Sequence, residues 1–268
     1  MTLGAGLGLA LLSALALNWG WLEQHGAARD LPRLSLARPV HSLCLLFGDR
    51  TWVIGFFVGI AGWVFYVAAL ALAPISLVQG TAAGGVGLLA ALAHRRGDTI
   101  SPADWSGAAA AILGLVLIAV SLVGGATSAT RPAPGALTVW LILSCALAAL
   151  TFRRRAGIAS GALYAAGDVV TKAAVFGGAW LGLVPVILAA HGLAFVALQL
   201  GFQGGDALET AGTASVLTNA LPIAAGLVLF DEALPSGALG TVRLVGFVLV
   251  IGAAGLLARD RGLTVAPA

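Results

Sequence analysis

Long apolar segments follow one another along the whole chain, and they limit what it can fold into. A helix needs about 20 mainly apolar residues to cross a bilayer. Nine segments approach that length: residues 3–22, 51–73, 74–94, 103–124, 136–152, 157–176, 180–203, 208–230 and 237–258. Because backbone groups in lipid must be satisfied within each segment, helices are expected. The sequence therefore predicts an all-α integral membrane protein with about nine transmembrane helices, or ten if the short segment 36–48 inserts.

The composition excludes a soluble globular domain. Only 9% of the residues are charged and 60% are hydrophobic, whereas about 25% of a soluble domain is charged. The 14 Lys and Arg residues are spread along the chain, so no nucleic-acid partner is expected. The two cysteines form no metal-binding or redox motif, and we expect no metal site and no cofactor.

The basic residues predict an orientation. If the loop at 23–50 faces one side of the membrane, eleven of the fourteen basic residues collect there. They are Arg29, Arg33, Arg38, Arg50, Arg95, Arg96, Arg153, Arg154, Arg155, Arg259 and Arg261. The positive-inside rule then places the N-terminus outside the cytoplasmic membrane and the C-terminus in the cytoplasm. No basic residue precedes the first apolar run, so segment 3–22 is expected to remain as a span and not to be cleaved as a signal peptide.

Segment 157–176 carries two charges inside an otherwise apolar stretch. Asp168 and Lys172 are four residues apart, so on a helix they share a face and can pair. Ser160 and Tyr164 continue the same row. An ionisable residue at bilayer depth costs at least about 2.5–3.5 kcal/mol, so it normally faces a bundle interior. The pattern predicts the lining of a solute pathway; the alternative is a self-neutralising pair that only fixes helix packing.

Further polar residues lie deep in other segments. His191 could carry a proton near neutral pH, although it could equally be a neutral residue bonded to a neighbouring helix. Pro222 deprives the carbonyl of Thr218 of its helical partner, as in many transporter sites or in a simple kink. The candidate pathway residues are Asp168, Lys172, Tyr164, Ser160, His191, Asn219, Thr218, Gln79, Tyr66 and Trp63. Asp231 and Glu232, by contrast, are expected to be solvated acids in a turn.

The two halves of the chain show weak internal similarity. Residues 74–80 (PISLVQG) can be laid on residues 214–220 (ASVLTNA), and the polar loop around residue 130 separates the halves. We therefore expect two repeats, at 1–130 and 131–268. An odd number of spans in each would place consecutive copies inverted in the bilayer, a recurring plan in transporters.

These segments resemble a known family. ALALAPISLV (residues 69–78) and TASVLTNALPI (residues 213–223), with Phe230-Asp-Glu after the second, resemble the paired EamA-like repeats of the drug/metabolite transporter superfamily. The span count and the helix with Asp168 and Lys172 look more like its NIPA-like branch of magnesium transporters. The resemblance implies about ten helices around a cavity between inverted EamA-like repeats, moving solutes without ATP.

The expected function is a secondary transporter, an exporter or exchanger of a small organic metabolite working by alternating access. The alternatives are a Mg²⁺ transporter of the NIPA-like type and a non-transporting membrane scaffold. One deep acid beside a lysine is a poor divalent-cation site. No P-loop or catalytic motif occurs, so no enzyme is expected. The expected partners are the bilayer and a small-molecule solute that could be proton-coupled; a homodimer is a possible assembly.

Overall fold

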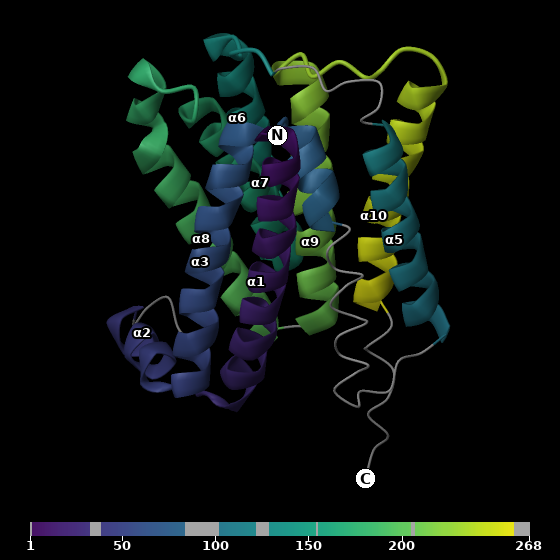
Figure 1. The fold of residues 1–268 in the computed structure, drawn as a ribbon. Helices are drawn as coiled ribbons and strands as arrows, with labels where there is room; N and C mark the ends of the chain where they lie inside the picture. Colours follow the sequence, from purple (N-terminus) through teal and green to yellow (C-terminus); the bar gives the residue numbers. More distant parts are fainter. Residues whose placement is uncertain are drawn as a thin grey trace.

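A computed structural model describes residues 2–32, 39–83, 102–121, 129–153, 155–204 and 207–259, and within these ranges it contains helices and no strand. Ten helical elements have defined bounds (Figure 1): α1 Thr2–Asp30, α2 Pro39–Gly48, α3 Arg50–Leu72, α5 Pro102–Ser121, α6 Pro134–Thr151, α7 Ala156–Ala174, the 3-10 helix η2 Gly178–Leu183, α8 Val184–Gly204, α9 Ala207–Leu229 and α10 Ala238–Arg259. Residues 75–83 form a further helix after Pro74, called here the 75–83 helix.

Four of these helices are long and apolar enough to cross a membrane: Leu3–Gly20, Arg50–Leu72, Pro134–Thr151 and Gly178–Gly201. Three shorter apolar helices cover Trp105–Ser121, Thr213–Leu229 and Ala238–Ala253. The expectation of an all-helical membrane protein is thereby supported, while the count of nine spans stays a prediction. The expected span 74–94 lies outside the described residues beyond residue 83, as do residues 36–38 of the short segment 36–48.

Large apolar side chains point away from the bundle. Phe57 on α3 is 60% exposed, Leu150 on α6 is 82% exposed and Val248 on α10 is 69% exposed. Soluble proteins rarely expose such side chains in contiguous patches, whereas lipid is as apolar as they are. These outer faces are therefore suited to contact with acyl chains.

Helix α7 lies at the centre of the bundle. Nearly all of its residues are buried, and it packs against α6, α8 and α9. Glycines permit this close packing, because a Cβ at Gly161 would lie 2.7 Å from the backbone oxygen of Ala214 on α9. Gly157 meets Thr210 and Thr213 of α9 in the same way. The Gly157–Gly161 pair is thus a packing seam, as small residues at this spacing often are in membranes.

A second glycine seam joins α1 to α3. A Cβ at Gly20 would lie 2.6 Å from the Gly55 oxygen, and a Cβ at Gly55 would lie 2.7 Å from the Gly20 oxygen. The two helices run side by side in Figure 1. Helix α1 also contacts α8, where Gln24 accepts a hydrogen bond from Gln199 at 3.4 Å.

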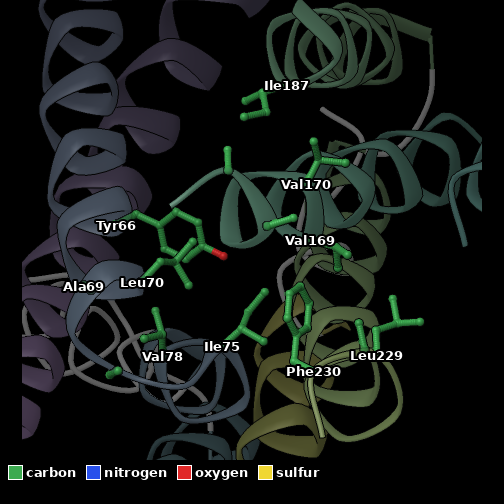
Figure 2. Close-up of a cluster of buried hydrophobic side chains, with 14 of the residues drawn as sticks. Tyr66, Ala69, Leu70, Ile75, Val78, Val169, Val170, Ile187, Leu229 and Phe230 are labelled. Carbon is green, nitrogen blue, oxygen red and sulfur yellow. The ribbon is translucent and has the colours of Figure 1, made fainter. Parts of the chain in front are cut away.

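The largest buried cluster lies where α3, the 75–83 helix, α7 and α9 meet (Figure 2). It contains Leu70, Ile75, Val169 and Phe230, and Tyr66 of α3 is also a buried member of it. This packing fixes α3 and the 75–83 helix against α7. It thereby sets the position of the polar side chains that these elements carry.

The chain turns sharply between α3 and the 75–83 helix, and two charged residues from the other half of the chain bind this corner. Lys172 Nζ donates to the carbonyl oxygens of Leu70 at 2.8 Å and Ala73 at 2.9 Å. The Glu232 carboxylate accepts from the backbone N–H groups of Ile75 at 2.6 Å and Ser76 at 2.8 Å. A cation at a helix C-terminus and an anion at a helix N-terminus both complement the helix dipole.

Candidate functional site

The interior of the bundle contains a cavity with a volume of about 410 Å³. It is lined by residues of α1, α3, the 75–83 helix, α7, α8 and α9. Ligand pockets usually have volumes of about 300–1,000 Å³ and a mainly apolar wall with a few placed polar groups. This cavity has that character and a size that suits a small solute.

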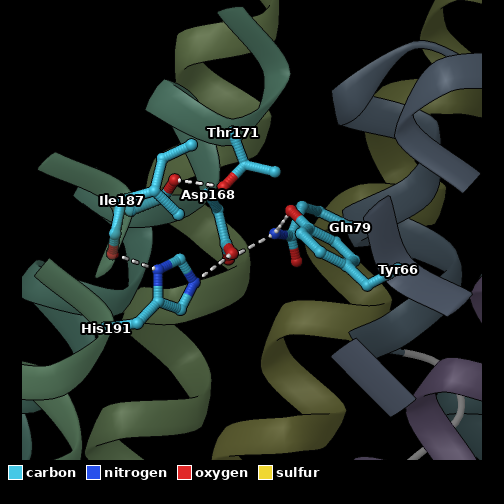
Figure 3. A network of polar contacts seen from close by, with 7 residues as sticks. Tyr66, Gln79, Asp168, Thr171, Ile187 and His191 are labelled. Atoms are coloured by element: carbon cyan, nitrogen blue, oxygen red, sulfur yellow. Dashed lines mark hydrogen bonds and ion pairs between the residues drawn. The ribbon is translucent and has the colours of Figure 1, made fainter. Parts of the chain in front are cut away.

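Asp168 is the centre of a polar network on the cavity wall (Figure 3). Its Oδ2 accepts a hydrogen bond from Gln79 Nε2 at 2.8 Å, and its Oδ1 lies 3.3 Å from His191 Nε2. Gln79 Nε2 also donates to the Tyr66 hydroxyl at 2.6 Å. The network joins the 75–83 helix and α3 to α7 and α8, so it connects the first half of the chain to the second.

The hydrogen bonds of His191 assign its protons. Its Nδ1 lies 2.9 Å from the Ile187 carbonyl oxygen, which can only accept, so we assign a hydrogen to Nδ1. The Nε2 contact with Asp168 then needs a second proton, since a bare imidazole lone pair would repel a carboxylate. The proton belongs either to an imidazolium or to a protonated carboxyl group, and the pair is neutral overall in both cases.

Aromatic side chains form much of the remaining wall. Trp63 and Tyr164 meet the His191 ring edge to face, with centroid distances of 5.9 and 5.8 Å. Phe56 of α3 and Phe195 of α8 also line the cavity, with their centroids 6.2 Å apart. Such rings can bind the apolar part of a solute or a cation over a ring face.

Three buried polar atoms on residues that line the cavity have no hydrogen-bond partner in the described part of the chain. They are Ser13 Oγ, Trp63 Nε1 and Thr218 Oγ1. Unpaired buried polar atoms are costly in protein interiors. Their residues line the cavity, but the three atoms themselves are buried and do not face its open space.

The structure brings eight of the ten predicted residues to the cavity: Trp63, Tyr66, Gln79, Tyr164, Asp168, His191, Thr218 and Asn219. The Asn219 side chain donates to its own helix, at Ser215 O, at 2.7 Å. Helix α9 continues through Pro222, so the proline does not interrupt it.

The predicted Asp168–Lys172 ion pair is wrong. The two residues share a face of α7, but the long Lys172 side chain reaches the carbonyls that end α3, and Asp168 contacts Gln79 and His191. Neither Lys172 nor Ser160 lines the cavity. Ser160 Oγ donates to Ala194 O at 2.9 Å and so joins α7 to α8.

The expectation for Glu232 was also wrong. It is not solvated but 3% exposed, because the N–H groups at the start of the 75–83 helix need an acceptor. Asp231 is exposed, as expected. Ser13, Asn18 and Gln24 of α1 also line the cavity, although the sequence pattern did not predict them as pathway residues. Ser13 and Asn18 were visible as polar residues inside an apolar segment.

No group of three or more His, Cys, Asp or Glu side chains that could hold a metal ion occurs among the described residues. The cavity offers one carboxylate, from Asp168, with neutral oxygen and nitrogen atoms around it. Mg²⁺ binds through carboxylates and retained waters in near-octahedral geometry. The described donors are therefore few for a divalent ion.

Apolar helices around a solute-sized cavity with polar groups on its wall indicate an α-helical membrane protein. It is 24% identical over 275 residues to a protein named probable magnesium transporter NIPA9 from Arabidopsis thaliana, an alignment covering 91% of this chain and 78% of the relative. No family model matches the chain, and no solved structure matches it. The relative supports a membrane transporter and the NIPA-like part of the resemblance, while membership of the wider superfamily stays an expectation.

Proposed function

We propose that this protein is a secondary transporter, an exporter or exchanger that carries a small organic solute across the cytoplasmic membrane by alternating access. The observation that carries the proposal is the cavity of about 410 Å³ with the Asp168–His191 pair on its wall. An ionisable residue inside a membrane usually marks a substrate or ion pathway. The transporter name of the similar protein from Arabidopsis thaliana supports the same class.

The walls of the cavity support an alternating-access mechanism. Helices α1 and α3 and the 75–83 helix come from one half of the chain, and α7, α8 and α9 come from the other. Rocking one half against the other around a fixed central site would open the cavity to each side in turn. The Gln79–Asp168 hydrogen bond crosses between the halves, so a solute that competes for Asp168 would loosen this connection.

Transport into proteoliposomes tests this function. We expect the purified protein to move at least one solute from a panel of amines, amino acids, organic anions and nucleobases. Asp168→Asn should lower that flux by at least about tenfold, since it removes the only carboxylate among the described residues of the cavity wall. Asp231→Asn is the matched control, because Asp231 is exposed outside the cavity. Its backbone φ of 50° is one that Asn tolerates.

If the Asp168→Asn protein transports every solute at the rate of the unaltered protein, the cavity is not the transport pathway. The variant must be shown to be folded, for which its unfolding midpoint in detergent is the measure. A folded Asp168→Asn protein that transports normally would place the pathway elsewhere.

Mg²⁺ transport is the second candidate, and the printed name of the similar protein is the observation that favours it. The same proteoliposomes, loaded with a Mg²⁺-sensitive dye, test it directly. Saturable Mg²⁺ entry that is lost in Asp168→Asn would favour this candidate over an organic solute. The single carboxylate among the described donors argues for the organic solute.

A further inference from the structure

We propose that the cavity binds a monovalent organic ammonium ion and that this ion replaces the proton held between Asp168 and His191. The inference rests on the transporter function proposed above and names the substrate class and the exchanged ion. It is carried by the hydrogen bonds of His191, by the charges around the cavity and by its aromatic walls.

The first step concerns the charge of the Asp168–His191 pair with and without its shared proton. With Nδ1 of His191 donating to Ile187, one more proton must lie between Nε2 and the Asp168 carboxylate. When that proton leaves, the imidazole is neutral and the carboxylate is negative, so the site has a charge of −1. A monovalent cation beside the carboxylate restores neutrality. One proton therefore exchanges for one cation.

The second step concerns the charges that face this pair. Among the described residues no Lys or Arg lines the cavity, and the lining residues of α1, α9 and the 75–83 helix are uncharged. The titratable neighbours within the cavity are Tyr66 of α3 and Tyr164 of α7. Lys172 and Glu232 lie at the α3 corner, where both are bound to backbone groups. In the described part of the cavity wall, an anionic solute would thus meet a carboxylate and no lysine or arginine.

The third step concerns the shape and chemistry of the walls. Trp63, Tyr164, Phe56 and Phe195 present aromatic rings, and an alkylammonium ion binds favourably over such rings. A divalent ion beside this single described carboxylate would instead leave one excess positive charge at the site.

Proton release on binding tests the exchange. The full-length protein in detergent is titrated with ethanolamine, choline or tetramethylammonium chloride near neutral pH in a weak buffer. An indicator dye reports protons, and calorimetry in two buffers of different ionisation enthalpy reports binding. We expect close to one proton released for each cation bound. Asp168→Asn should abolish release and weaken binding by at least about tenfold, while Asp231→Asn should change neither.

His191→Gln separates proton exchange from simple support of the fold. A glutamine amide can donate to Asp168 but does not titrate, so the carboxylate loses the partner that shares the proton. We expect ammonium binding to persist and proton release to fall well below one per cation. Release of a full proton in this variant would overturn the assignment of the proton to the pair.

Flux measurements distinguish failure of this inference from failure of the proposed function. Uptake of the bound ammonium ion, driven by an outward proton gradient in proteoliposomes, supports both. Ammonium binding without proton release overturns the inference. Asp168-dependent transport of anions or Mg²⁺ alone also overturns it, but leaves the proposed transporter function in place. Ammonium binding with proton release but no flux supports the inference for the site and overturns the transporter.

Discussion

Lys172 caps the C-terminal end of α3, a helix to which it does not belong. Its ammonium group satisfies two carbonyl oxygens that α3 leaves without helical partners. Lys172 is buried, with 6% of its surface exposed, so water does not take its place at these carbonyls. The charge of Lys172 therefore stabilises the end of α3. The carboxylate of Asp168, one turn away on α7, has no ion pair with it and faces the cavity.

Replacing Lys172 should weaken the fold and spare the site. We expect Lys172→Met to lower the free energy of unfolding by about 1–3 kcal/mol, the usual effect of leaving buried polar groups unpaired. Thermal unfolding in detergent measures this, and binding of the transported solute should change by less than about twofold. Lys172→Arg, which keeps the positive charge, is the comparison. A Lys172→Met protein with an unchanged midpoint but no solute binding would contradict the capping role.

The sequence identified the polar residues of the site but not the groups that each of them contacts. Asp168, His191, Gln79 and Tyr66 were recognised because polar groups are rare inside apolar segments, and the structure brings them into one network. The partner of Lys172 was not predictable from helix spacing, because its four-carbon stem reaches a neighbouring helix. Only the packing of α3 against α7 decides which acceptor lies within reach.

Among the helices, the contact between α7 and α8 controls the geometry of the Asp168–His191 pair. Gly167 lies one residue before Asp168, and a Cβ at this position would overlap the His191 ring at Nδ1 and Cε1. The ring fits only because position 167 has no side chain. The close approach of the two helices thus determines where the imidazole lies.

Gly167→Ala should displace the imidazole and damage the site without adding or removing any polar group. We expect solute flux to fall by at least about tenfold, because small misplacements of a functional group have effects of that order or larger. The unfolding midpoint should fall moderately, as overpacking in a core costs about 1–3 kcal/mol. Gly252→Ala on α10 is the control, since a Cβ there meets nothing within 4 Å. Normal flux in Gly167→Ala would show that the ring position is unimportant.

Helix bounds were largely predictable from the sequence, whereas contacts between helices were not. The expected segment 136–152 corresponds closely to α6, and 208–230 corresponds to α9. Helix α1 continues past the expected end at residue 22 to Asp30, because apolarity marks where a membrane segment ends but not where a helix ends. The buried position of Glu232 depends on a contact more than 150 residues away along the chain, which local patterns do not encode.

The whole molecule has two ends that the membrane must place on opposite sides. In Figure 1 the chain begins at one end of the bundle, and α10 finishes at the other. The C-terminal end of α1 and the N-terminal end of α3 lie at the same end as the finish of α10. Arg50 begins α3, and the positive-inside rule assigns such basic residues to the cytoplasm.

Labelling of single cysteines tests this orientation. The native thiols Cys44 and Cys145 are both exposed and would first be replaced by alanine. Arg131 and Arg153 are exposed just before and just after α6. We expect an impermeant maleimide to label Arg131→Cys on intact cells and Arg153→Cys only after permeabilisation. The reverse pattern would invert the proposed topology, and labelling of both on intact cells would remove α6 as a span.

The corner between α3 and the 75–83 helix has a consequence for biosynthesis. Its two stabilising charges, Lys172 and Glu232, are far downstream of the corner itself. While the chain is being inserted, the exposed carbonyls and N–H groups of this corner need other hydrogen-bond partners, from the insertion machinery or from lipid headgroups. The hairpin becomes fully satisfied only after Glu232 has left the ribosome. Nascent chains stopped before Glu232 should therefore be the preferred substrates of membrane quality-control proteases.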